Sequence, residues 1–182
     1  MNKILLSIKN PRKPCNMSKI IVANWKMNGS LEMIDEYSSY IKGVQKMKNI
    51  VIIAPPFVYL KTLHDVLHGS GIFVASQDVS SNEKTAFTGK ICTDMIADCG
   101  AKYAIIGHSE QRQYRHLTDE EIKKKAELLL HKNLKPIICI GETWKEKEEG
   151  FDLQSIQKQL YRILNNIDRS RSSEIIIAYE PV

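Results

Sequence analysis

Residues 103–142 decide the fold, and they read YAIIGHSEQRQYRHLTDEEIKKKAELLLHKNLKPIICIGE. The stretch is bounded by two short apolar runs, Tyr103–Ile106 and Pro136–Ile140, in which isoleucine is frequent. Between these runs, apolar residues recur at helical spacing through residues 122–130. Runs that are apolar throughout are typical of strands buried on both faces of a parallel sheet. The stretch therefore predicts a strand, a helix and a second, parallel strand.

The start of the helix in this unit is marked by Thr118, which is followed three residues later by Glu121. This spacing predicts a capping box, in which each side chain binds a free backbone N–H of the first helical turn.

The same alternation continues on both sides of this unit. The other apolar runs lie at residues 20–23, 50–54, 72–75 and 174–178. Helical stripes of apolar residues separate them, and these are Ile34, Tyr37, Ile41 and Val44; Phe57, Leu60, Leu63 and Leu67; Met95, Ile96 and Ala97; and Leu153, Ile156, Leu160, Ile163, Leu164 and Ile167.

Six strands with helices between them predict a right-handed parallel β/α architecture in one domain, which we place at residues 17–182. A closed β/α barrel typically has eight strands and about 250 residues. Two alternatives follow from this shortfall: an open six-stranded sheet, or an incomplete barrel with about six of its eight β/α units.

Composition is that of an ordinary globular protein and excludes several classes. The formal net charge is +5, but Lys3, Lys9, Arg12 and Lys13 carry four of these charges, which leaves +1 for residues 17–182. Nucleic-acid binding by bulk charge is therefore not expected. No apolar run approaches the roughly 20 residues that span a bilayer, so no membrane partner is expected. The four cysteines form no CxxC pair, which is typical of reduced thiols in the cytoplasm.

Residues 1–16 stand apart from this pattern. They are basic, and their apolar stretch Ile4-Leu5-Leu6 is too short for a signal peptide. We expect a disordered N-terminal extension, or a segment upstream of a natural start at Met17. A basic organelle-targeting leader is the alternative.

Polar and titratable residues that could take part in a reaction follow the predicted strands. Because parallel strands present their carboxyl ends at one edge of the sheet, these residues should face one mouth. A lysine, a histidine and a glutamate in such a mouth suit proton abstraction next to the carbonyl of an anionic substrate. The candidates are Asn24, Trp25 and Lys26; Gln77 and Asp78; Gly107, His108, Ser109 and Glu110; Gly141 and Glu142; and Glu180.

Several of these segments resemble the triosephosphate isomerase family, in the right order and from about Met17 to the last residue. The resemblance is carried by Ala23–Asn28, Ala86–Gly89, Ile105–Glu110, Cys139–Glu142 and Ala178–Val182. Two positions depart from the family pattern: Gln111 stands where arginine is common, and Leu117 where an acidic residue is usual. We expect both departures to affect packing more than chemistry.

The resemblance implies an incomplete (β/α)8 TIM barrel that interconverts dihydroxyacetone phosphate and D-glyceraldehyde 3-phosphate, a step of glycolysis and gluconeogenesis. It implies that Glu180 is the catalytic base and that a neutral His108 polarises the carbonyl, which is a known property of this family. Lys26 would bind the anionic substrate and stabilise the enediolate, and Asn24 would assist in binding it.

The resemblance also assigns supporting roles and partners. Glu110 would orient Lys26, with Ser109 beside it, and Thr88 would lie in a loop that enters the partner subunit of a homodimer. The expected substrate is a small triose phosphate, the expected location is the cytoplasm, and no metal or cofactor is implied.

For some residues a structural role is a simpler interpretation than a functional one. His64 and His68 have a metal-like spacing but no recognisable third ligand, so we interpret them as surface residues. Lys123–Lys125 and the charged run 145–149 are typical of solvated helix faces. Cys139 is interpreted as a packed strand thiol near the site and not as a nucleophile.

Two other hypotheses compete with an active isomerase. The first is an inactive, C-terminally truncated fragment, because in the family a lid and most phosphate-binding loops follow the motif that ends in Val182. Such a fragment would have unpaired strand edges, poor stability and little turnover. The second is a non-enzymatic β/α binding or scaffold protein.

Overall fold

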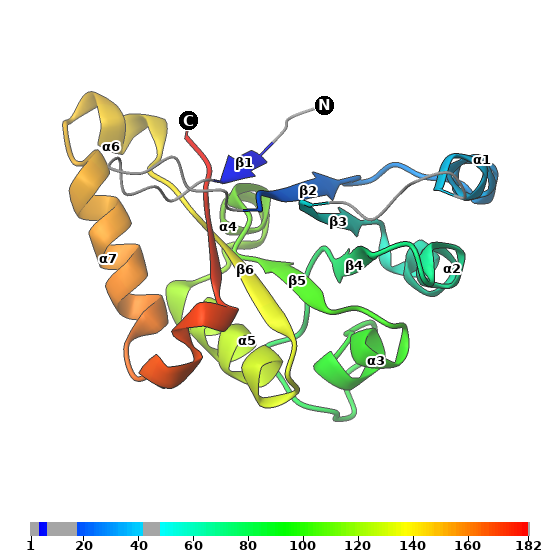
Figure 1. Cartoon of the computed structure of the whole chain (residues 1–182). Coiled ribbons are helices and arrows are strands. Elements are labelled where there is room, and N and C mark those ends of the chain that lie inside the picture. The colour runs from blue at the N-terminus through cyan, green and yellow to red at the C-terminus, as the bar shows by residue number, and fades with distance from the viewer. Residues whose placement is uncertain (1–3, 7–17, 42–47, 182) are drawn as a thin grey trace.

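A computed structural model describes residues 4–6, 18–41 and 48–181 (Figure 1). Strands and helices alternate along almost the whole chain. The strands are β1 (Ile4–Leu6), β2 (Ile20–Asn24), β3 (Ile50–Ala54), β4 (Ile72–Ser76), β5 (Tyr103–Ile106), β6 (Lys135–Ile140) and β7 (Ile176–Tyr179). The helices are α1 (Leu31–Ile41), α2 (Phe57–Leu67), α3 (Thr93–Asp98), α4 (Ser109–Arg115), α5 (Asp119–His131), α6 (Trp144–Glu148), α7 (Asp152–Leu164) and the 3₁₀ helix η1 (Arg169–Glu174).

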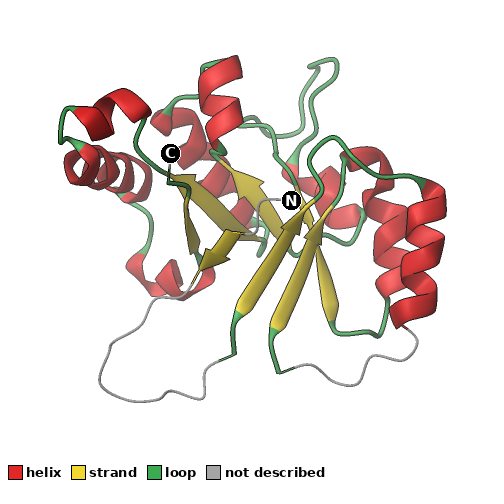
Figure 2. Ribbon diagram, turned by 90° about the horizontal axis from the view of Figure 1, so that it is seen from above, coloured by secondary structure: helices red, strands yellow, loops and turns green. Residues whose placement is uncertain are grey.

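The strands form one seven-stranded sheet in chain order, β1 to β7. Strands β2 to β7 are parallel to their neighbours, whereas β1 pairs antiparallel with β2. Seen from above, the parallel strands curl into a half-barrel with helices around it (Figure 2). The predicted parallel β/α architecture is confirmed, and of the two alternatives the incomplete TIM barrel is the correct one.

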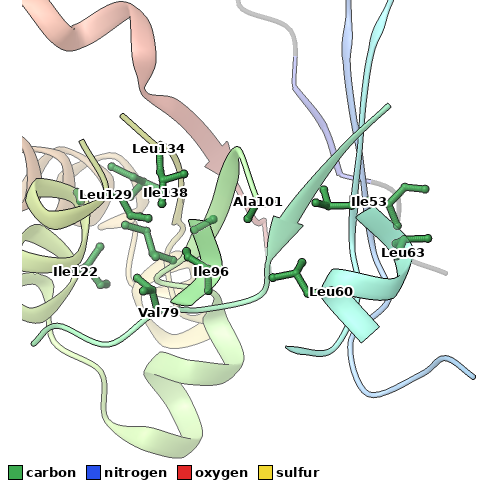
Figure 3. Close-up of a cluster of buried hydrophobic side chains, with 14 of the residues drawn as sticks. Ile53, Leu60, Leu63, Val79, Ile96, Ala101, Ile122, Leu129, Leu134 and Ile138 are labelled. Atoms are coloured by element: carbon green, nitrogen blue, oxygen red, sulfur yellow. The ribbon is translucent and has the colours of Figure 1, made fainter. Parts of the chain in front are cut away.

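Alternate residues of each strand enter two different cores, which explains why the strands are apolar throughout. Ile53 faces outward and packs with Leu60 and Leu63 of α2, in a core between the sheet and the helices (Figure 3). Its neighbours Ile52 and Ala54 face the inside of the half-barrel. The members of this inner core are Ile52, Ala54, Ala75, Tyr103, Ile105, Ile137, Cys139 and Ala178.

The predicted capping box at the start of α5 is confirmed. The side chain of Thr118 accepts from the backbone N–H of Glu121, and the Glu121 carboxylate accepts from the backbone N–H of Thr118. The bonds that the Glu121 carboxylate accepts from the backbone N–H and from the hydroxyl of Thr118 lower the pKa of Glu121. Thr143 and Glu146 form a second capping box at α6, which the apolar pattern did not reveal because every residue of α6 after Trp144 is charged.

The structure differs from the sequence-based expectations at the chain ends. The last strand begins at Ile176 and not at Glu174, because Glu174 completes η1 and forms an ion pair with Arg171. Residues 4–6 form a strand, whereas the expectation was disorder for residues 1–16; residues 1–3 and 7–16 lie outside the described residues, so disorder there stays a prediction. Val44 of the predicted first helix also lies outside them.

Candidate active site

The predicted site residues come together at the carboxyl ends of three strands. Asn24 ends β2 and Lys26 follows it, His108 follows β5, and Glu180 follows β7. Because these strands run parallel in one curled sheet, their carboxyl ends meet at one edge of the half-barrel. A pocket opens at this edge, and its lining residues are Gly107, Ser109, Arg112, Ile140, Gly141, Glu142, Glu180 and Pro181.

Glu180 and His108 are in direct contact. Oε1 of Glu180 lies 3.1 Å from Nε2 of His108, and Oε2 of Glu180 accepts a hydrogen bond of 2.8 Å from the backbone N–H of Ser109. Both side chains are largely shielded, with exposed fractions of 13% and 9%. Segments that are distant in the sequence therefore bring the carboxylate and the imidazole together, largely shielded from solvent.

The hydrogen bonds of His108 indicate its tautomer. Its Nδ1 accepts from the backbone N–H of Glu110 at 3.3 Å, so Nδ1 carries no proton in this arrangement. The distance from Nδ1 to Oε2 of Glu110 is 3.5 Å, which is too long for a normal hydrogen bond. The proton of a neutral imidazole then resides on Nε2 and points at Glu180. His108 is also the N-cap residue of α4, because its side chain accepts from this backbone N–H of the first helical turn.

Lys26 is held by a strained turn and by an ion pair. Its φ is 53°, a left-handed conformation that is uncommon outside glycine, and its backbone N–H donates to Oδ1 of Asn24 at 2.9 Å. Its ammonium lies 2.7 Å from Oε1 of Glu110. This hydrogen bond lowers the pKa of Glu110, so the pair persists above the ordinary pKa of the carboxyl group and is lost as pH falls through the lowered value.

Gln77, which directly follows β4, stabilises this turn through hydrogen bonds. Its side-chain amide donates to the carbonyl oxygens of Lys26 and Ala54, each at 2.9 Å. One side chain thereby ties the turn after β2 to the end of β3.

We expect Gln77→Leu to lower the free energy of unfolding by about 1–2 kcal/mol, because the carbonyl groups of Lys26 and Ala54 each lose a hydrogen bond, and only that of Ala54 keeps another one among the described residues, from the backbone N–H of Trp25. Urea unfolding followed by circular dichroism measures this. Gln77→Glu is the matched variant: it keeps the size but cannot donate as a carboxylate, so it should be destabilised too. An unfolding midpoint that stays the same in both variants would contradict the supporting role.

Arg112 lines the site, although the sequence analysis did not single it out. Its guanidinium donates to the carbonyl oxygen of Gly107 at 2.9 Å, to Asp119 at 2.7 Å and to the carbonyl oxygen of Cys139 at 3.3 Å. It thus joins the end of β5 to β6 and to the first turn of α5. The available signal was an arginine on the helix that directly follows the histidine.

Cys139 and Glu142 complete the site on the β6 side. Burial, and next the negative charge of Glu180, raise the pKa of the Cys139 thiol well above its usual range, which agrees with a packed and unreactive thiol. Glu142 is buried and accepts a hydrogen bond of 3.0 Å from the hydroxyl of Tyr179. Burial first, and then this bond, raise the pKa of Tyr179.

Asp78 is a strand-end residue that the structure directs away from the reacting groups. It forms an ion pair of 2.7 Å with Lys125 of α5, whose side chain is only 7% exposed. The interpretation of Lys123–Lys125 as a solvated face is therefore wrong for Lys125, because Asp78 provides the partner that allows its burial.

We expect Asp78→Ala to destabilise the fold by about 3 kcal/mol, because the ammonium of Lys125 stays buried without its partner. This is the low end for such pairs, since the Asp78 side chain is 24% exposed. Thermal unfolding measures the effect. Adding Lys125→Met to the same chain should restore part of the loss; a double variant less stable than Asp78→Ala would contradict this account.

The remaining predicted residues lie outside the site. Thr88 is exposed in the segment between β4 and α3. His64 and His68 have ring centroids 6.5 Å apart, and no group of three metal-binding side chains occurs within residues 4–6, 18–41 and 48–181. Among the helices that the structure describes, none has both the length and the apolar character needed to cross a membrane.

The arrangement provides a carboxylate, an imidazole Nε2–H and a nearby ammonium at the mouth of a parallel β/α fold. Such a set can remove a proton from carbon and stabilise the resulting oxyanion. The fold defines the class as a parallel β/α-barrel protein, and the residue types at its strand ends suit proton transfer.

Comparison with known proteins gives the family. The model of the triosephosphate isomerase family matches residues 19–182, so the chain belongs to that family. Curated relatives named triosephosphate isomerase include those of Buchnera aphidicola subsp. Acyrthosiphon pisum, 46% identical over 89% of this chain and 65% of the relative, and Citrifermentans bemidjiense, 39% identical over 94% and 67%. The protein of Stenotrophomonas maltophilia (strain K279a) is 36% identical over 90% of this chain and 66% of its own length. The chain thus spans about two thirds of these relatives.

Proposed function

We propose that this chain carries the proton-transfer site of a triosephosphate isomerase, which interconverts dihydroxyacetone phosphate and D-glyceraldehyde 3-phosphate. Family membership supports the substrate, and the site supports the chemistry. The single observation that carries the proposal is the contact between Glu180 and His108, with Lys26 held beside them through Glu110.

The first step belongs to Glu180. Its carboxylate takes a proton from the carbon next to the substrate carbonyl, and the electron pair of that C–H bond moves to the carbonyl oxygen to give an enediolate. The Nε2–H of His108 donates a hydrogen bond to that oxygen, and the ammonium of Lys26 offsets the developing negative charge.

The second step reverses these transfers on the neighbouring carbon. His108 gives its Nε2 proton to one enediolate oxygen and takes a proton from the other. Glu180 then returns its proton to the adjacent carbon, which completes the isomerisation without any net change of the protein.

The substrate must reorganise the site before this sequence starts. The Nε2–H of His108 points at Glu180 in the described structure, and the same hydrogen cannot be directed well at both Glu180 and a carbonyl oxygen. Substrate binding is therefore coupled to a movement of the Glu180 carboxylate away from His108 and toward the reacting carbon.

The proposed setting of this reaction follows the family. Asn24 assists Lys26 in binding the anionic substrate, and the exposed segment around Thr88 forms the contact of a homodimer in the cytoplasm. No metal or cofactor enters the proposed steps.

The test is an isomerase assay on the 182-residue chain, with glyceraldehyde 3-phosphate as substrate and a coupled dehydrogenase to detect dihydroxyacetone phosphate. Running the reaction in D₂O adds a specific signature, because transfer through an enediolate incorporates deuterium at carbon. Turnover with deuterium incorporation supports the proposal. A folded chain without turnover would favour the inactive-fragment hypothesis, which is the competing prediction.

A further inference from the structure

The N-terminal strand β1 occupies the outer edge of β2. Ile4, Leu5 and Leu6 pair with Val22, Ile21 and Ile20, and the pairing is antiparallel in a sheet whose other pairs are all parallel. Strand β1 also lies next to β7, at the other margin of the curled sheet. It therefore lies in the opening of the half-barrel, between the two margins (Figure 1).

This edge needs a cover for physical reasons. Without β1, one side of β2 would present unpaired N–H and C=O groups on a strand that reads Ile-Ile-Val-Ala-Asn. An apolar strand with an open edge is a template for pairing with another chain. The sequence Ile-Leu-Leu of β1 is apolar and suited to a strand, and it is bounded by the basic Lys3 and the polar Ser7.

The pairing of β1 with β2 is short. Three residue pairs cover Ile20–Val22, whereas Ala23 and Asn24 at the carboxyl end have no partner in β1. The antiparallel direction matters as well, because a strand that continued the barrel would pair with β2 in parallel. Strand β1 therefore cannot act as an additional barrel strand, and it blocks the position where one would pair.

We propose that residues 4–6 form a detachable edge strand: they protect β2 from self-association, and any parallel strand that pairs with this edge of β2 must first displace them. This role is independent of the isomerase reaction, because the residues proposed to react, Lys26, His108 and Glu180, follow β2, β5 and β7. It assigns a purpose to a segment that the family resemblance leaves unexplained.

The test is amide hydrogen exchange on the whole chain, with Ile4→Pro/Leu5→Pro compared with the wild type. Successive residues of a strand direct their N–H groups to opposite sides, so one of the two prolines removes a donor aimed at β2. The exchange of the Ile20 and Val22 amides, which face β1, should accelerate by about tenfold or more, while the Ile21 amide, which faces β3, and the amides of β5 serve as internal references. Light scattering should detect concentration-dependent self-association of the same variant.

Two matched variants complete the design. Lys9→Pro adds a proline outside β1 and should leave the exchange of β2 as in the wild type. Ile4→Gly/Leu5→Gly weakens the strand without a proline ring, and it should show the same selective pattern with a smaller amplitude. Exchange in β2 that is unchanged, or that rises only in parallel with β5, would overturn the proposal.

Discussion

Glu180→Gln is expected to lower kcat/KM for the isomerisation of glyceraldehyde 3-phosphate by about 10³-fold, because the amide cannot accept the proton from carbon. The change keeps the size and shape of the side chain, so substrate binding should change far less than turnover. Steady-state kinetics should therefore show the loss mainly in kcat.

The same variant is also expected to change the hydrogen bonds that position the side chain. The two carboxylate oxygens of Glu180 face two N–H groups, Nε2 of His108 and the backbone of Ser109. An amide has only one oxygen, so its NH₂ group must face one of these donors. Part of the effect will therefore be a displaced side chain, and the circular dichroism and unfolding midpoint of the variant need to be compared with the wild type.

Glu180→Asp is the matched control. It keeps a carboxylate but withdraws it by one methylene, so it should retain more activity than Glu180→Gln while still being impaired. A Glu180→Gln variant within about threefold of the wild type would mean that another group is the base, since a general base contributes about 10²–10⁴-fold.

The sequence was sufficient for the features that depend on periodicity and on strand order. The strands could be predicted because both faces of each are buried, so an apolar run marks each one. The gathering of Asn24, Lys26, His108 and Glu180 could be predicted because parallel strands share one carboxyl edge. The roles of these residues stay predictions until kinetic measurements test them.

Other features depend on contacts between residues that no local pattern connects. Lys125 reads as one of three exposed lysines until the fold places Asp78 against it. The contacts of Arg112 with β6 require the three-dimensional path of three segments. The strand at residues 4–6 pairs with the edge of β2, and three apolar residues alone do not predict such a pairing.

Gly141→Ala is expected to lower kcat/KM by about 10²-fold, because the added methyl group would displace the backbone that carries Glu180. A Cβ at Gly141 would meet the carbonyl oxygen of Glu180 far inside van der Waals distance. Backbone cannot rotate away as a flexible side chain does, so β6 and the end of β7 must separate.

The surroundings leave little room for Gly141 itself to move. Its backbone N–H donates to Oε1 of Gln159 at 3.1 Å, and its carbonyl oxygen accepts from Nε2 of Gln159 at 2.8 Å. In addition, the backbone N–H of Glu180 donates to the carbonyl oxygen of Ile140 at 2.8 Å, next to Gly141 in the chain. The strain will therefore act on Glu180, and overpacking should also lower the free energy of unfolding by about 1–3 kcal/mol.

Gly150→Ala separates these two effects. Gly150 has a φ of 75° in the turn before α7, and a Cβ there would have no neighbour within 4 Å. This control should lose stability through backbone strain but keep its kinetic constants, because the turn lies away from the reacting groups. If Gly141→Ala also kept wild-type kinetics, the close contact between β6 and β7 would not be what positions the base.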